Sequence, residues 1–232
     1  MDTITDQGLY RLMTWLSPTF PVGAFAYSHG LEYAVETEAV KDAASLTDWV
    51  GGILSFGAGR VDASLFRAGW EAIQADDDER LAWVVERADV LRGTAEMALE
   101  SSAQGRAFLE TLLRAWPHPR LARWYDDLVF QGREPAYGVA VAVACALTGV
   151  PLRAALLAYL NAFAANLVSA GVRLVPLGQT DGQRTLAALE ADISAAVDAA
   201  LGRDPDDLGS AALTVDWMSI QHETQYTRLF RS

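Results

Sequence analysis

Residues 154–172 read AALLAYLNAFAANLVSAGV, a stretch without a charged side chain. A membrane-spanning helix is arguable at this length, since a span needs about 20 apolar residues. The composition argues against a span, because alanine outnumbers leucine and the polar side chains of Asn161, Asn166 and Ser169 interrupt the stretch. A helix that is apolar on all sides is otherwise buried by protein. We therefore predict a central helix of a packed domain.

Side chains of two sizes occupy different sides of this predicted helix. The small ones recur at three- and four-residue spacing and would let a second backbone approach closely. A monomer of this size has few further residues with which to cover the uncharged surface around these small side chains. We therefore predict a homodimer, in which a second copy covers it. The small seam comprises Ala155, Ala158, Ala162, Ala165 and Ser169, and the larger face comprises Leu156, Leu160, Phe163 and Leu167.

The rest of the chain also has the pattern of helices. Apolar residues recur at helical spacing in almost every window, and alternating β-branched runs are absent. Proline and glycine break the pattern at residues 17–23, 117–119 and 132–135. The sequence predicts an all-α fold, a single-domain helical bundle of about ten helices. We place the helical domain at residues 1–203 and, within the same domain, a linker and C-terminal partner-binding tail at residues 204–232.

Local signals predict where some of the helices begin. Ser45 followed by Asp48 is typical of a capping box, which predicts a helix start at that point. A second helix is expected to begin near Tyr27. Residues 94–116 are expected to form one long or broken helix.

Charge and cysteine content exclude several classes of protein. The chain has 18 basic and 30 acidic residues, so its formal net charge is −12. It lacks the basic field that binding to a nucleic acid would need. Cys145, the single cysteine, excludes an intrachain disulfide and lies in the run VAVACAL, where we expect a buried and inert thiol. The N-terminal stretch MDTITDQGLY has no apolar core of a secretory signal, so the cytoplasm is the expected compartment.

Signatures of catalysis and of metal binding are missing from the sequence. A P-loop needs a lysine after its glycines, and the only lysine, Lys41, follows no such loop. His29, His118 and His222 are dispersed, unlike clustered zinc ligands, and each is expected at the surface or at a helix cap. There is no G-x-S-x-G motif. We predict no catalytic residue, no cofactor and no stable metal site.

Three polar segments have a pattern that packing alone does not explain. They read SPTFPVGAFAYSHGLEYAVE at residues 17–36, RLVPLGQTDGQR at 173–184 and MSIQHETQYTRLFRS at 218–232. Together they resemble the UreF family of urease accessory proteins, and the similarity runs over essentially the whole chain in the family's order. The segment RLVPLGQTDGQ and the C-terminal HETQYTRLFRS carry the resemblance most specifically.

The resemblance implies an all-α, cytoplasmic and dimeric protein that is not itself a catalyst. Members of the family bridge UreD, also named UreH, and the nickel-carrying GTPase UreG. The assembly docks on apo-urease and installs nickel there, and the UreF protein modulates GTP hydrolysis by UreG. The P-loop missing from this chain would belong to that partner.

The resemblance also implies which residues meet partners. Tyr27 would pair with Arg228 or Arg231 once UreD binds, although a tyrosine near a helix start is commonly a core residue. Glu32 would face UreG, or would be only a solvated helix residue. Gln179 would lie in a dimer groove or face UreG, or would simply cap a helix. The complete set of expected partner-binding residues is Tyr27, Glu32, Arg173, Gln179, His222, Glu223, Tyr226, Arg228, Leu229, Phe230 and Arg231.

The C-terminal tail has two interpretations. As a free terminus it would become ordered only when a partner binds. Alternatively, Leu229 and Phe230 fill the domain's own core. Two other function classes also stay open on the residues alone, an all-α enzyme of unknown chemistry and a membrane-associated helical hairpin.

Overall fold

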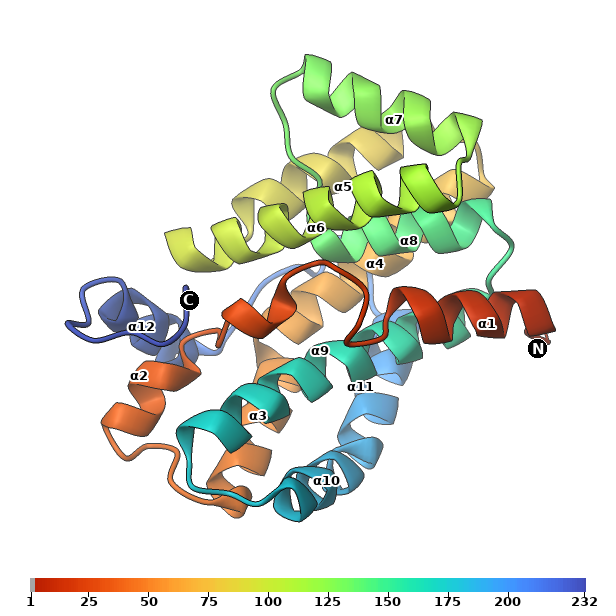
Figure 1. Ribbon diagram of the computed structural model, residues 1–232. Helices are drawn as coiled ribbons and strands as arrows, with labels where there is room; N and C mark the ends of the chain where they lie inside the picture. Colours follow the sequence, from red (N-terminus) through yellow and green to blue (C-terminus); the bar gives the residue numbers. More distant parts are fainter. Residues whose placement is uncertain (1–2) are drawn as a thin grey trace.

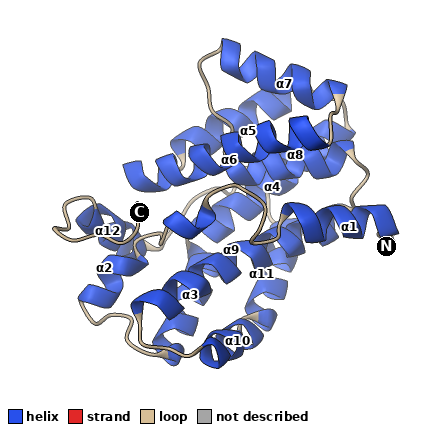
Figure 2. Ribbon diagram, in the orientation of Figure 1, coloured by secondary structure: helices blue, strands red, loops and turns tan. Residues whose placement is uncertain are grey.

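The structure is a computed structural model that describes residues 3–232. Over these residues it contains twelve α-helices, one short 3-10 helix and no strand, so the predicted all-α class is confirmed (Figure 2). The helices are α1 (Asp6–Trp15), η1 (Ala24–Ala26), α2 (Leu31–Glu36), α3 (Ala43–Phe56), α4 (Ala58–Gln74), α5 (Asp78–Val90), α6 (Ala95–Ala115), α7 (Pro119–Phe130), α8 (Tyr137–Leu147), α9 (Leu152–Leu174), α10 (Gln179–Ala188), α11 (Glu190–Gly202) and α12 (Leu213–His222).

Helix α4 connects two groups of helices. In Figure 1, α5, α6, α7 and α8 gather in the upper part of the view, and α3, α9, α10 and α11 gather in the lower part. Helix α4 packs against members of both groups, namely α5 and α8 on one side and α3, α9 and α11 on the other. Helix α8 is buried from Gly138 to Ala146, where it contains only glycine, alanine, valine and cysteine and therefore has no polar face.

The central helix predicted from residues 154–172 is α9. Its larger side chains Leu156, Leu160 and Leu167 are buried, as expected for the face toward the domain. The small seam becomes more exposed along the helix, from the buried Ala155 to the exposed Ser169. By length and composition α9 could cross a membrane, but half of its most apolar window is buried inside the fold, as in the core helix of a soluble protein.

Two predicted helix starts are wrong by a few residues. The N-cap of α3 is Asp42, whose carboxylate accepts from the backbone N–H of Ser45 at 2.8 Å, while the Ser45 hydroxyl accepts from Asp42 N–H at 3.1 Å. Ser45 is therefore the N3 residue of the capping box, not its start. Helix α2 begins at Leu31 and not near Tyr27, because Gly30 precedes it in the left-handed region with φ of 78°.

The core contains a buried ion pair, Arg92 with Asp62, and a buried cysteine, Cys145. The guanidinium of Arg92 lies 2.8 Å from Asp62, and the phenol of Tyr159 donates to the same carboxylate at 2.9 Å. Burial lowers the pKa of Arg92, but the nearby Asp62 carboxylate more than compensates, so the pKa of the guanidinium is raised. Cys145 is fully buried, and burial raises the pKa of its thiol to about 12. The expectation of an inert cysteine agrees with this environment.

Two helical glycines give a test of the packing. A Cβ on Gly105 of α6 would lie 1.9 Å from the carbonyl oxygen of Pro135, whereas a Cβ on Gly52 of α3 would meet nothing within 4 Å. We expect Gly105→Ala to lower the free energy of unfolding by at least about 2 kcal/mol, through overpacking. The control Gly52→Ala should raise it by about 0.5–1 kcal/mol, through helix propensity. Urea denaturation measures both, and equal effects would contradict this packing of α6.

Candidate functional site

The end of the chain folds back onto the beginning. After α12, the backbone N–H of Arg231 donates to the Ala26 carbonyl at 2.8 Å, and the backbone N–H of Ser28 donates to the Ser232 carbonyl at 2.8 Å. Ser232 is buried. The interpretation as a free, fraying terminus is therefore wrong for these residues, because they have partners in η1 and in the segment that leads from η1 to α2.

His222, the last residue of α12, lies at the centre of this contact. Its side chain is 0% exposed, and both of its ring nitrogens meet carboxylates. Nδ1 lies 2.7 Å from a carboxylate oxygen of Glu96 on α6, and Nε2 lies 3.1 Å from one of Glu32 on α2. Both ring nitrogens therefore have a carboxylate partner. His222 thereby connects three helices.

The same two carboxylates hold the tail. Glu32 accepts from the backbone N–H of Leu229 at 2.7 Å and from that of Phe230 at 2.8 Å. Glu96 accepts from the guanidinium of Arg228 at 2.9 Å. Buried carboxylates are costly without donors, and charge-assisted hydrogen bonds of this kind are among the stronger ones in proteins. Here the donors come from His222 and from the tail.

A second buried carboxylate group lies beside the first. Glu100, one turn after Glu96 on α6, lies 3.2 Å from Nδ1 of His29 and accepts from the hydroxyl of Ser232 at 3.1 Å. Gln104, one further turn along α6, donates to the other oxygen of Glu100 at 3.4 Å. The polar side of α6 therefore faces the chain end and not solvent.

The backbone permits this arrangement because α2 and α12 approach closely. A Cβ on Gly30 would lie only 2.9 Å from the backbone nitrogen of Ser219 on α12. The Ser219 hydroxyl is hydrogen-bonded to that of Thr94, the N-cap of α6, at 2.7 Å. Gly30 is thus required twice, for its positive φ and for this contact.

Phe230 connects the tail to α9. Its side chain is 4% exposed, and its ring lies 4.4 Å from the guanidinium carbon of Arg173 near the end of α9. The guanidinium also donates to the Phe25 carbonyl at 2.9 Å. Partial burial lowers the pKa of Arg173, but the group stays charged near neutral pH because arginine is a very strong base. The exposed cation of Arg173 is therefore fixed by the tail and by η1.

The structure brings most of the expected partner-binding residues together in one region. Glu32, His222 and Phe230 form its buried side, with Arg228 half exposed beside Glu96. Its exposed side comprises Glu223, Tyr226, Leu229 and Arg231. We name this region the tail site, defined as Glu32, Glu96, Glu100, Arg173 and residues 222–232.

Two of the alternative residue roles are wrong, and one expected pairing is not tested. Tyr27 is buried, and its pairing with Arg228 or Arg231 was expected only once UreD binds, so that pairing stays a prediction. Gln179 does not cap a helix, because Gly178 is the N-cap of α10 and Gln179 is its first residue. Glu32 is only 7% exposed and is hydrogen-bonded under the tail, so it is not a solvated helix residue.

Sequence reasoning missed Glu96, Glu100 and the buried position of His222 and His29. The histidines were expected at the surface or at caps, yet both lie inside, each paired with a glutamate of α6. The sequence does contain one indication of this polar side of α6. Glu96, Glu100 and Gln104 are spaced four residues apart, which places the three polar side chains on one side of the helix. Their burial depends on partners far away in the sequence.

The part of the chain that the structure describes contains no group of three or more His, Cys, Asp or Glu side chains arranged to hold a metal ion. At the tail site, both ring nitrogens of His222 are already occupied by carboxylates. The arrangement binds and orients a chain segment.

Known proteins resemble this chain over nearly its whole length. A family model described as UreF matches residues 40–190. The chain belongs to the UreF family of urease accessory proteins. A relative from Granulibacter bethesdensis, named urease accessory protein UreF, is 52% identical over 98% of this chain and 95% of its own length. A relative of the same name from Rhodopseudomonas palustris (strain HaA2) is 52% identical over the same shares of the two chains. The family resemblance stated from the three polar segments is confirmed.

Phe230 and Leu229 provide a test of the docked tail in the UreF family fold. Phe230 is 4% exposed, whereas the neighbouring Leu229 is 68% exposed. We expect Phe230→Ala to lower the free energy of unfolding by about 3–4 kcal/mol, as for a buried aromatic side chain. The control Leu229→Ala should change it by about 0.5 kcal/mol or less. Thermal and urea unfolding without any partner measure both, and a Phe230→Ala chain as stable as wild type would show that the tail is not docked.

Proposed function

We propose that this chain is a non-catalytic scaffold for nickel insertion into urease. It bridges UreD/UreH and the GTPase UreG, the assembly docks on apo-urease, and the chain modulates GTP hydrolysis by UreG. Membership of the UreF family supports this proposal, since the relatives carry the name urease accessory protein. Nickel is the cargo of the assembly and not a resident cofactor of this chain.

The observation that carries the proposal is the two-sided tail. Its inner side is fixed by Glu32, Glu96 and Glu100, while Tyr226 and Leu229 on its outer side are exposed. Helix α12 continues this surface with the exposed apolar side chains Leu213, Trp217 and Ile220 at helical spacing. Grouped exposed apolar side chains of this kind mark protein interaction sites. We assign this outer surface to UreD/UreH.

Arg173 is the group best suited to contact UreG. Its guanidinium is charged, exposed and oriented by Phe230 and Phe25, so a partner that binds it does not have to order it first. Gln179 lies exposed in the segment that follows. Glu32 is buried, so its contribution to UreG binding is indirect and acts through the position of the tail.

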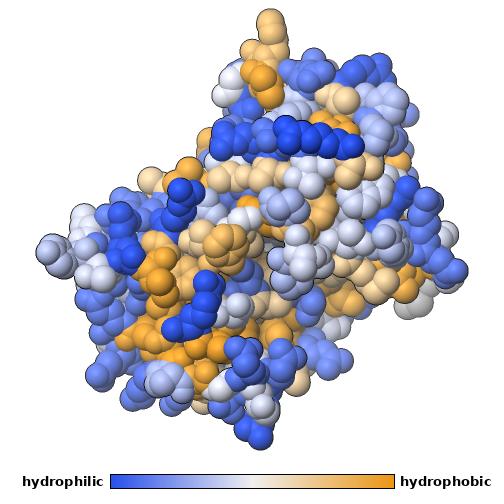
Figure 3. Space-filling view, viewed as in Figure 1, coloured by the Kyte–Doolittle hydropathy of each residue, from blue (hydrophilic) through white to orange (hydrophobic). Residues whose placement is uncertain are grey.

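The seam of α9 supports the proposed homodimer. Ala158, Ala162 and Ala165 are only half buried, and the neighbouring Leu157 is 43% exposed. Figure 3 shows apolar residues gathered on the lower part of the visible face, over the position of α9 in Figure 1. A second copy packed along this seam would cover them. We propose that such a complex acts in the cytoplasm.

Co-purification with cognate UreD and UreG tests the scaffold function. We expect Leu229→Asp to lose UreD, because a charge enters an apolar interface. The control Val129→Asp, on a residue of α7 that is also exposed, should retain UreD. Arg173→Ala should retain UreD but weaken UreG binding about tenfold or more, while the exposed Arg184→Ala does not. Wild-type chain that binds neither partner would refute the proposal.

Light scattering tests the homodimer. The wild-type chain at micromolar concentration should have twice the mass of the 25.1 kDa monomer. Ala162→Glu places a charge in the seam and should shift the mass to that of a monomer, whereas the exposed Ala39→Glu should not. A wild-type chain that is monomeric both alone and with its partners would rule out the dimer.

A further inference from the structure

His222 makes contacts that need one more proton than its neutral ring carries. A neutral imidazole has one N–H donor and one acceptor nitrogen, whereas an ionised carboxylate only accepts. Yet Nδ1 lies 2.7 Å from Oε2 of Glu96, and Nε2 lies 3.1 Å from Oε2 of Glu32. With a neutral ring and two ionised carboxylates, one of these contacts would bring two acceptors together. One additional proton, on the ring or on either carboxyl group, makes both contacts hydrogen bonds.

The charges around His222 lead to the same count. Glu96 also accepts from the guanidinium of Arg228 at 2.9 Å, and over residues 3–232 no other arginine or lysine pairs with Glu32 or Glu96. Two ionised carboxylates beside one guanidinium leave one negative charge in excess, which the additional proton balances. His222 is 0% exposed, Glu32 7% and Glu96 8%, and an unbalanced charge among such buried groups is costly. We name Glu32, Glu96, His222 and Arg228 the His222 network.

The titratable groups that surround the network do not remove this requirement. His29 makes one contact with a carboxylate, from Nδ1 to Glu100 at 3.2 Å, and over residues 3–232 its Nε2 has no hydrogen-bond partner. A neutral ring with its hydrogen on Nδ1 satisfies that contact. In the same part of the chain, no other charged side chain of α2, α6, α12, the end of α9 or the tail is hydrogen-bonded to the network. These side chains include Glu36, Glu100, Asp216, Glu223, Arg173 and Arg231.

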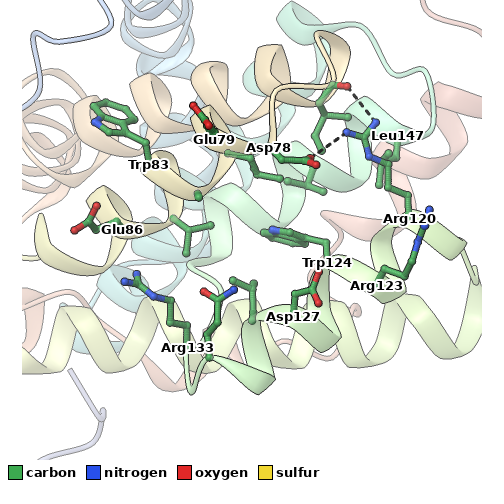
Figure 4. Close-up of a pocket in the computed structure, with 17 residues that line it drawn as sticks. Asp78, Glu79, Trp83, Glu86, Arg120, Arg123, Trp124, Asp127, Arg133 and Leu147 are labelled. Atoms are coloured by element: carbon green, nitrogen blue, oxygen red, sulfur yellow. Dashed lines mark hydrogen bonds and ion pairs between the residues drawn. The ribbon is translucent and has the colours of Figure 1, made fainter.

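Other carboxylates of the fold have donors that need no additional proton. The buried Asp62 meets the guanidinium of Arg92 at 2.8 Å and the phenol of Tyr159 at 2.9 Å, and both groups are donors at neutral pH. Exposed carboxylates have water as a donor. Figure 4 shows one of them in the cleft between α5 and α7, where Asp78, with its side chain 89% exposed, lies 3.6 Å from the guanidinium of Arg120. The requirement is therefore specific to the contacts of His222.

We propose that docking of the tail is linked to a proton held by the His222 network. When the tail opens, water reaches these groups, and free histidine and glutamic acid are half-protonated at about pH 6.5 and about pH 4.3. Above about pH 6.5 the open form has therefore released the additional proton, while the closed form still holds it. Because the closed form binds more protons, it loses stability as the pH rises. The ratio of closed to open tail falls by up to about tenfold per pH unit, until the closed form releases the proton as well.

The link makes the outer surface of the tail sensitive to pH. The docked tail presents Tyr226 and Leu229 on one fixed surface and, through Phe230, orients Arg173. A rise in pH favours the open form, in which these side chains no longer share a fixed surface. The proton link is a property of the isolated chain, whereas its effect on UreD/UreH binding rests on the proposed function.

Amide hydrogen exchange of the isolated full chain tests the link. The protection factor divides the intrinsic peptide exchange rate at each pH by the observed rate, which removes the ordinary pH dependence of exchange where closing is faster than exchange. For the Leu229 and Phe230 amides of wild type, we expect this factor to fall at least about tenfold between about pH 6.5 and 8.5. A protection factor that stays constant over this range would overturn the proposal.

Glu96→Gln removes the need for the proton and keeps every contact. Its amide group donates to Nδ1 of a neutral His222, the Nε2–H of that ring donates to Glu32, and the amide oxygen still accepts from Arg228. We expect the protection factor of this variant to change less than about twofold over the same range. The matched control His29→Gln alters the neighbouring histidine and should retain the wild-type fall. An equal fall in wild type and Glu96→Gln, or the loss of the fall in His29→Gln, would assign the proton to another group and overturn the proposal.

A measurement on wild type decides the case in which the tail of Glu96→Gln does not dock. NMR of the chain with isotope-labelled histidine rings and glutamate carboxyl groups should show His222, Glu32 or Glu96 releasing a proton over the range in which protection is lost. The proposal fails if none of the three does so.

Binding of cognate UreD separates the proton link from the proposed function. The affinity of wild type for UreD should fall between about pH 6.5 and 8.5 by more than that of Glu96→Gln, because only wild type has the proton to lose. Proton-linked exchange with equal pH dependence of UreD binding in the two chains would support the link and contradict the assignment of UreD to the tail. A flat protection factor in wild type would overturn the link whatever UreD does.

Discussion

Buried carboxylates must have hydrogen-bond donors, and this requirement determines how the chain ends. Glu32, Glu96 and Glu100 lie inside the fold on α2 and α6. Most of their partners come from the end of the chain, namely His222, the guanidinium of Arg228, the backbone of residues 229–230 and the hydroxyl of Ser232, while His29 and Gln104 also contact Glu100. An unpaired buried charge costs several kcal/mol, on the order of 3–5 kcal/mol when one partner is removed. The tail is thus a structural part of the domain and not an appendage.

The hydrogen bonds of Glu32, Glu96 and Glu100 also give the two sides of the tail different roles. Groups that face inward hold the segment in one conformation. Over residues 3–232, the outward side chains of Glu223, Tyr226, Leu229 and Arg231 take part in no hydrogen bond or ion pair. Because Phe230 contacts Arg173, the same docking that fixes the tail also orients a cation at the end of α9. A partner that binds the outer side of the tail and moves it would therefore also change the orientation of Arg173, the residue that we assign to contact with UreG.

The sequence predicts the fold much better than the site. Helix α9 and the all-α class follow from periodicity and composition, which are local, and the three polar segments suffice for the family resemblance. The pairing of His222 with Glu32 and Glu96 joins residues separated by 190 and 126 positions, and no local pattern carries that information. The start of α3 shows the same limit on a small scale, because both Asp42 and Ser45 suit a capping box and only the backbone conformation selects Asp42.

Amide hydrogen exchange at Leu229 and Phe230 tests most directly whether the network holds the tail. Both backbone N–H groups donate to the buried carboxylate of Glu32, at 2.7 and 2.8 Å. In the isolated wild-type chain we expect these two amides to exchange as slowly as those of the middle of α12, because they are released only when the network opens. Exchange of both amides at the rate of an unstructured peptide, in a chain whose α12 amides are protected, would contradict the account.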